Sequence, residues 1–177
     1  MSTQLRKYMT AHLLWWKLLT FGALAFCGLF LVSFLLGNDV DFSGLLFDLL
    51  LLGLSLVPQI KVRKSIATLE SSEMLRYIET DFENAIIMRN DLVRFGKAWI
   101  FIKGKQKPLA YRDIRQVYQY VHRTNFIENE RKLMYVDQNG KKGTLCKLKL
   151  RGKSDADVNR MVSIILNKNP YVKIGYR

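Results

Sequence analysis

The stretch LLTFGALAFCGLFLVSFLL, from Leu18 to Leu36, contains no charged residue, although the chain carries a formal net charge of +13. With the residues before it, it forms an apolar segment over 13–36 in which Lys17 is the single charge. A helix needs roughly 20 apolar residues to cross ~30 Å of hydrocarbon, so this segment predicts a transmembrane helix. A signal peptide is the alternative interpretation, but its apolar core is usually only ~7–15 residues long, and no A-x-A cleavage pattern follows this segment.

A second apolar segment, FSGLLFDLLLLGLSLVPQI at residues 42–60, follows after the short link GNDVD. Gly, Asn and Asp favour turns, so the two segments together predict an antiparallel transmembrane hairpin. Lysines and arginines flank both outer ends, in LRKY and KVRK, whereas the link contains none. The positive-inside rule then predicts a multi-pass cell-membrane protein with both termini in the cytoplasm, residues 1–12 being a cytoplasmic tail.

Four side chains of the hairpin stand out by their chemistry. Trp15 and Trp16 fall at its inner end, where indole rings commonly anchor a helix at the membrane interface. Lys17 lies near the inner face and Asp48 near the outer face, so most of the bilayer separates them and they cannot pair within one hairpin. Charges inside a membrane are candidates for function, and Asp48 is the stronger candidate for contact with another subunit. The alternative is that each charge reaches its own interface, Lys17 by snorkelling.

The pattern changes after residue 60. Residues 61–83 predict a juxtamembrane linking helix, with apolar residues near one face. Residues 84–177 then contain strand-like apolar runs, and the Asn139-Gly140 step inside RKLMYVDQNGKKGTLCKLKL predicts a β-hairpin. A final amphipathic helix is predicted from the apolar positions 158, 161, 162 and 165, with Ser154 as its N-cap and Asn169-Pro170 as its end. The chain is therefore predicted to be α+β, with an antiparallel sheet or small barrel and a helix over one opening.

This order of elements resembles a pleckstrin-homology-like (PH-like) domain of the membrane-tethered bacterial kind. The stretches FGKAWIFIKGKQKPLAYRDIRQVYQYVHR and NPYVKIGY are similar to those of small two-helix membrane proteins of Gram-positive bacteria. The resemblance implies a binding platform at residues 84–177, and it carries over no catalytic residue and no headgroup-binding motif.

The sequence contains few residues or motifs that indicate catalysis or metal binding. The two cysteines, Cys27 and Cys146, are interpreted as reduced and apolar, since one lies in the hairpin and the other in the polar part. His12 and His122 are predicted to lie apart, and no nucleotide-binding, hydrolase or metalloprotease motif occurs. We therefore predict no enzymatic activity, no cofactor and no metal site.

The basic residues are more informative, because residues 1–60 have three basic and three acidic residues, so the whole excess lies beyond residue 60. The candidates for membrane-surface binding are Lys61, Arg63, Lys64, Lys103, Lys105, Lys107, Lys141 and Lys142. Each basic residue near an anionic leaflet contributes about 1 kcal/mol. The alternatives are a solvated surface, an acidic protein partner and, least favoured, nucleic acid.

The interpretation we favour is a non-enzymatic membrane protein whose basic PH-like module binds anionic lipid of the inner leaflet or a partner protein. The alternative is an immunity or accessory subunit that acts through the hairpin on a toxin, secretion or transport system. The partners considered are membrane lipids and, besides them, a partner protein or further copies of the chain.

Overall fold

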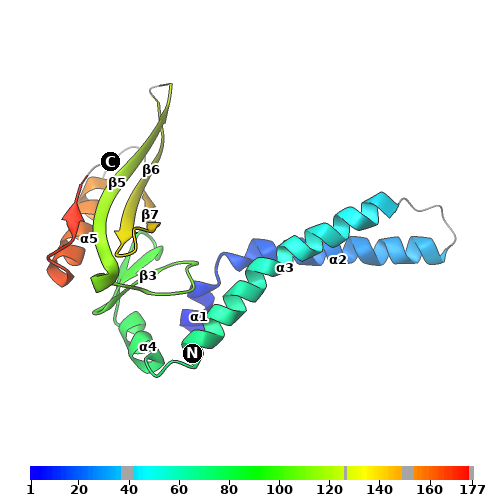
Figure 1. Cartoon of the computed structure of the whole chain (residues 1–177), viewed down its shortest axis with the longest axis horizontal. Helices are drawn as coiled ribbons and strands as arrows, with labels where there is room; N and C mark the ends of the chain where they lie inside the picture. The colour runs from blue at the N-terminus through cyan, green and yellow to red at the C-terminus, as the bar shows by residue number, and fades with distance from the viewer. Residues whose placement is uncertain (37–41, 126, 149–153, 176–177) are drawn as a thin grey trace.

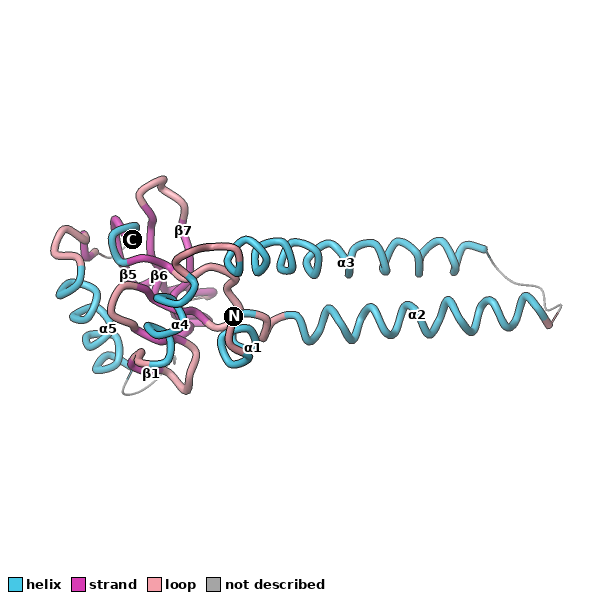
Figure 2. The backbone as a smooth tube through the Cα atoms, turned by 90° about the horizontal axis from the view of Figure 1, so that it is seen from below, coloured by secondary structure: helices cyan, strands magenta, loops and turns pink. Residues whose placement is uncertain are grey.

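Two long helices project from one side of a globular part in the computed structural model, which describes residues 1–36, 42–125, 127–148 and 154–175 (Figure 1). These helices, α2 (Leu13–Leu35) and α3 (Phe42–Glu70), are long and apolar enough to cross a membrane. They lie side by side in both views (Figures 1 and 2). The predicted link GNDVD and Leu150 of the predicted return strand lie outside the described residues, and the Ser154 side chain is not described either.

The second long helix is longer than the predicted span. At 29 residues, α3 measures about 43 Å, whereas the hydrocarbon core of a bilayer is ~30 Å thick. It continues through Pro58 to Glu70, so the predicted linking helix over 61–83 is divided. Its first part belongs to α3, a turn follows at residues 71–74, and its second part is α4 (Leu75–Glu83).

The predicted tail over residues 1–12 is instead a folded element. Residues Thr3–Met9 form helix α1, which Ser2 caps by accepting a hydrogen bond from the Leu5 N–H. The apolar residues at positions 5, 8 and 9 share one face, and all three are buried against the globular part. Because that burial stabilises so short a helix, its partners matter more than its intrinsic propensity.

Two four-stranded sheets make up the globular part. The first is antiparallel and follows chain order: β1 (Ile86–Met88), β2 (Val93–Phe95), β3 (Trp99–Ile102) and β4 (Leu109–Ala110). The 3₁₀ turn η1 (Tyr111–Asp113) leads into the second sheet, whose order is β7-β6-β5-β8. Its strands are β5 (Ile114–Thr124), β6 (Ile127–Asp137), β7 (Lys142–Leu148) and β8 (Lys173–Ile174).

The α+β class is confirmed, but the described strands do not form one closed antiparallel barrel. They form two separate sheets, and β8 pairs with β5 in parallel. The β6–β7 hairpin is present, and Gly140 at its turn has a φ of +78°, a conformation that glycine adopts without strain. A register shift in this hairpin, between Leu133 and Met134, explains why Leu145 and Cys146 are both buried although they are neighbours.

The main core lies between the sheets and helix α5 (Ser154–Lys168). Helix α5 contributes Val158, Met161 and Ile165, which recur at helical spacing and are each at most 2% exposed. Asn169 follows the helix, and its side-chain amide donates to the carbonyls of Tyr111 and Ile114 over 2.8 and 3.0 Å. These bonds fix the end of α5 to the turn between the two sheets.

Candidate functional site

Helix α1 forms the junction between the long helices and the globular part. One buried cluster joins α1 to α4 and β3, and its members are Leu5, Tyr8, Met9, Ile78, Phe82 and Phe101. Tyr8 donates its hydroxyl to the Phe101 carbonyl over 3.2 Å, and the Gly104 N–H donates to the Tyr8 carbonyl over 3.0 Å. Gly104 has a φ of +81°, and a Cβ added there would lie 3.3 Å from His12. Glycine therefore lets the chain after β3 pass close to the end of α1.

The start of α2 is fixed next to α3 as well. Leu13, Val62 and Ile66 form a small buried cluster, each less than 9% exposed. Arg6 of α1 pairs with Glu70 at the end of α3, with 2.6 Å between Nη2 and Oε1. The end of α3 is thus brought back beside α1 and the start of α2, which lie more than 50 residues earlier in the chain, and all three meet next to the first sheet.

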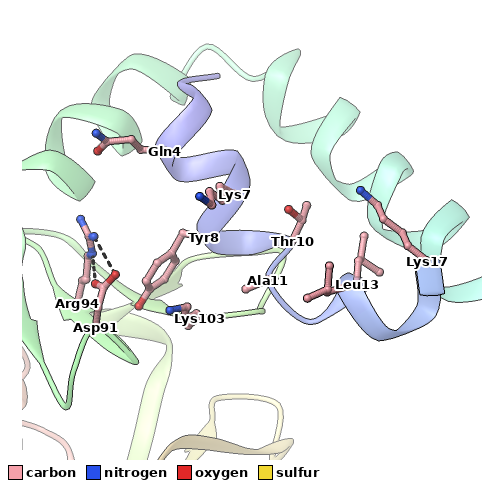
Figure 3. Close-up of a pocket in the computed structure, with 11 residues that line it drawn as sticks. Gln4, Lys7, Tyr8, Thr10, Ala11, Leu13, Lys17, Asp91, Arg94 and Lys103 are labelled. Carbon is pink, nitrogen blue, oxygen red and sulfur yellow. Dashed lines mark hydrogen bonds and ion pairs between the residues drawn. The ribbon is translucent and has the colours of Figure 1, made fainter. Parts of the chain in front are cut away.

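A cavity of about 650 Å³ opens at this junction, between α1, the first turns of α2 and the chain around β2 and β3 (Figure 3). We call it the junction cavity. Its described lining residues include Lys7, Lys17, Arg94 and Lys103, against the single carboxylate of Asp91. Four cations and one carboxylate give the lining a formal net charge of +3. An anionic group is the ligand that this charge favours.

The Asp91–Arg94 pair shapes one wall of the junction cavity. Arg94 Nε and Nη2 donate to the two Asp91 carboxylate oxygens over 2.6 and 3.1 Å. The guanidinium carbon lies 4.2 Å from the Phe82 ring centre and 5.2 Å from that of Tyr8. Burial, and after it the nearby Asp91 carboxylate, raises the pKa of Tyr8 above its ordinary value. The phenol therefore stays protonated and holds α1 as a hydrogen-bond donor, while Arg94 is already engaged.

The three lysines of the junction cavity differ from Arg94 because their side chains are exposed. Lys7 comes from α1, Lys17 from the first turns of α2, and Lys103 from the residue after β3. In Figure 3, Lys7 and Lys103 lie near Tyr8, whereas Lys17 extends on the α3 side of Leu13. Lys17 also lines a smaller cavity of about 330 Å³ with Gln59 and Arg63 of α3.

The residues predicted to bind the membrane surface do not form one patch. Lys61, Arg63 and Lys64 are exposed on the last turns of α3, and Lys103 joins the junction cavity. Lys107 is exposed between β3 and β4, and Lys141 and Lys142 are exposed at the β6–β7 turn. Lys105 is different, because its Nζ lies 3.0 Å from the Tyr135 hydroxyl and 4.7 Å from the ring centre. Lys105 thus helps to hold the β3–β4 connection to β6.

Lys17 and Asp48, the charged residues predicted in the hairpin, lie at different levels of it, but about half of the ~30 Å hydrocarbon thickness separates them and not most of it. Lys17 is at the level of Gln59, and about 16 Å of helix separates Gln59 from Asp48 at ~1.5 Å per residue. Trp15 and Trp16 are 75% and 36% exposed on α2, next to the junction cavity. An interfacial position suits both indoles.

The structure also shows a polar contact between α2 and α3 that the sequence analysis missed. Thr20 Oγ1 lies 2.9 Å from Ser55 Oγ and accepts a hydrogen bond from Gln59 Nε2 over 2.7 Å. Ser55 is only 1% exposed. Three polar residues in otherwise apolar segments could have indicated a polar contact within the hairpin. The sequence does not show that they meet, because that depends on the register of the two helices. Lys7, Tyr8 and Arg94 were missed for the same reason, since their common position depends on the docking of α1.

Metal clusters and reactive side chains are two kinds of chemical site that can be examined in the described residues. Within them, no three His, Cys, Asp or Glu residues are grouped so as to hold a metal ion. His122 stacks on Tyr120 of the same strand, with 6.5 Å between ring centres. Burial raises the pKa of the Cys146 thiol to about 11, which disfavours the reactive thiolate.

Comparison with protein-family models gives a match over residues 58–177, to the family described as Domain of unknown function (DUF6709). The match begins at Pro58 within α3 and covers α4, both sheets and α5. The searches of curated proteins and of solved structures gave no match.

Proposed function

The chain belongs to the DUF6709 family, and within it we propose a non-enzymatic integral membrane protein whose basic globular part binds the anionic surface of its own membrane. In this proposal α2 and α3 form a transmembrane hairpin. The globular part then sits at the inner leaflet, with both termini in the cytoplasm.

The observation that carries the proposal is the position of the exposed cations. Lys7, Lys17 and Lys103 lie where the long helices join the globular part, and Lys61, Arg63 and Lys64 extend along α3 from the same place. In a hairpin that crosses the bilayer, this junction is at the headgroup level. Tethering holds the cations near the lipid at high local concentration, so a modest affinity for each headgroup is sufficient.

Helix α1 supports the orientation. Because α1 precedes α2 and packs against α4 and β3, residues 1–12 and the globular part occupy the same side of the membrane. A single crossing would separate them, so α2 and α3 cross as a pair. The basic residues on this side then favour the cytoplasm by the positive-inside rule.

The PH-like assignment is part of the same proposal. It is supported by two mostly antiparallel sheets that share a core with one helix near the C-terminus. Helices α1 and α4 pack against β3 of the first sheet, which makes it the sheet nearest to the proposed membrane surface.

Reconstitution of the full chain tests this function. A fluorophore at Lys107→Cys in a Cys27→Ser background is measured in lipid nanodiscs that carry a headgroup quencher. We expect stronger quenching with phosphatidylglycerol than with phosphatidylcholine, and loss of the difference in high salt. The triple variant K61Q/R63Q/K64Q should weaken the quenching. The control R160Q/K168Q/K173Q should not, because its residues belong to α5 and β8, and α5 lies on the side of the globular part away from the long helices (Figure 1). Equal quenching by both lipids would contradict the proposal.

A second candidate is an accessory or immunity subunit, acting alone or as a homo-oligomer, whose hairpin assembles with other membrane helices. It is favoured by Gly22, Gly28, Gly44 and Gly53, because a Cβ added at any of them would meet no atom of the described residues within 4 Å. These glycines leave room for a neighbouring helix, and Asp48 lies on the same pair. Crosslinking in membranes should then show partners that Asp48→Leu removes. An unchanged pattern would exclude this candidate.

A further inference from the structure

We propose that the junction cavity binds the phosphate group of an anionic glycerophospholipid, with Lys7 and Lys103 as its main ligands and Lys17 as a third cation. This inference rests on the proposed function, and it goes further by naming a defined site instead of a diffuse basic surface.

The charges of the junction cavity favour a phosphate. The Asp91 carboxylate is occupied by Arg94 through two hydrogen bonds, which leaves the three lysines to set the local charge. Lysine side chains are strongly hydrated point charges that bind phosphate without a fixed geometry. Lys7, Lys17 and Lys103 are exposed, and none of them forms an ion pair with another described residue, so a bound phosphate can replace water on each of them.

The surroundings of the cavity favour a lipid over a free phosphate ion. Leu13 and Leu14 line the cavity, and Trp15 follows them on the outer surface of α2. Leu14 is 63% exposed and Trp15 75% exposed, so an apolar surface begins directly beside the cations. A glycerophospholipid can contact both the cations and this apolar surface, with its phosphate at the lysines and its acyl chains along α2. A soluble phosphate would leave the apolar part unused.

The size and rigidity of the cavity agree with a specific site. Ligand cavities usually measure about 300–1,000 Å³, and this one measures about 650 Å³. Its walls are held by the buried α1 cluster, the two hydrogen bonds of Tyr8 and Gly104, and the Asp91–Arg94 pair. The backbone that carries Lys7 and Lys103 is therefore fixed, so binding has to order only their side chains.

Lipid titration of the full chain in neutral detergent, followed by native mass spectrometry, tests this inference. The probes are short-chain phosphatidylglycerol, phosphatidylcholine and soluble glycerol phosphate. We expect phosphatidylglycerol to bind most tightly, and the K7Q/K103Q variant to bind it roughly tenfold more weakly or worse. The matched control is K168Q/K173Q, which removes the same charge from the end of α5 and from β8 and should change binding by less than about twofold.

A second variant tests the cavity without changing its charge. Ala11 lines the cavity and is exposed, so Ala11→Phe fills space without disturbing the buried cluster. It should also weaken phosphatidylglycerol binding at an unchanged melting temperature.

Each contrary result is informative. If both double-lysine variants lose phosphatidylglycerol binding equally, or if Ala11→Phe binds it fully, the junction cavity is not the binding site. The proposed binding to the membrane surface would then still stand. Glycerol phosphate binding as tight as phosphatidylglycerol binding overturns the lipid in favour of a free anion. No preference for phosphatidylglycerol over phosphatidylcholine overturns both this inference and the proposed function.

Discussion

At the scale of single residues, Asp81 of α4 holds the turn before β3. It is 8% exposed and accepts hydrogen bonds from the backbone N–H groups of Lys97, Ala98 and Trp99. The turn approaches so closely that a Cβ added at Gly96 would lie 2.3 Å from the Asp81 carboxylate. The carboxylate thus accepts hydrogen bonds from three N–H groups of the turn. It also fixes α4 to the first sheet, against which α1 packs.

Asp81→Ala should therefore lower the free energy of unfolding by about 3 kcal/mol, because it removes a charged acceptor from three partly buried N–H groups. Thermal unfolding of the full chain in detergent measures the effect. Asp113→Ala is the control, since the Asp113 side chain is 58% exposed and lies 3.9 Å from the Arg112 guanidinium, a long and exposed ion pair. Asp113→Ala should change stability by less than about 0.5 kcal/mol. An equally small loss for both variants would show that the Asp81 bonds contribute little.

Cys146 offers a test by pH. Burial raises the pKa of its thiol from 9.0 to about 11, so the folded state keeps its proton where the unfolded chain loses it. Its contribution to stability is full below pH 9 and is lost as the pH rises towards 11. In a Cys27→Ser background, maleimide labelling of the folded chain at pH 8 should be roughly 100-fold slower than that of a free thiol. The rate should keep rising beyond pH 9, and a plateau at pH 9 would contradict the shift.

At the scale of elements, helix α1 shows why some structure was not predictable. Leu5, Tyr8 and Met9 have helical spacing, but a segment of this length gives a weak signal and its partners are about 70–90 residues away. The strong signals were local ones. They include the uncharged run of α2, the Asn139-Gly140 turn of the β6–β7 hairpin, and the apolar face of α5, which Asn169 and Pro170 terminate. The junction cavity was missed because it depends on long-range docking.

The docking of α1 predicts a stability effect. Leu5 is fully buried, so Leu5→Ala should cost about 2–4 kcal/mol, and Leu5→Asp should release α1 altogether. Release should speed cleavage by trypsin at Arg6 and Lys7, which a docked helix protects. Thr3→Ala serves as the control, because Thr3 is exposed on the same helix. Equal cleavage of Leu5→Asp and the unmodified chain would show that α1 is not held in place.

The polar contact between α2 and α3 makes a separate prediction. Thr20, Ser55 and Gln59 join the helices where the surrounding side chains are apolar, and such bonds contribute about 0.6–2 kcal/mol. A double-mutant cycle of Thr20→Val and Gln59→Leu should give a coupling energy of about 1 kcal/mol, measured by unfolding in detergent. The same cycle with Thr68→Val in place of Thr20→Val should give none, since Thr68 bonds to a carbonyl of its own helix. Equal coupling in both cycles would rule out an interhelical bond.

At the scale of the whole molecule, the sequence was sufficient to predict the α+β class. It was not sufficient to predict whether the strands close into a barrel. Alternating apolar residues predict strands, but they do not reveal that β8 pairs with β5 in parallel or that the strands divide into two sheets. These features depend on pairing between segments far apart in the chain, as between β5 and β8. The candidate site shows the same limit. Lys103 was selected from a local cluster of lysines, whereas Lys7 and Arg94 become its neighbours only through the fold.

The packing of α1 on the globular part predicts the membrane topology independently of the charge rule. Tags placed before Thr3 and after Gly175 should be accessible from the same side, because separating them would break the buried cluster of α1, α4 and β3. A tag inserted between Leu36 and Phe42 should be accessible from the other side. The charge rule then predicts that the first two tags face the cytoplasm. Protease protection in sealed, oriented membrane vesicles measures all three. Opposite positions for the two terminal tags would contradict the paired crossing and, with it, the placement of the junction cavity at the lipid headgroups.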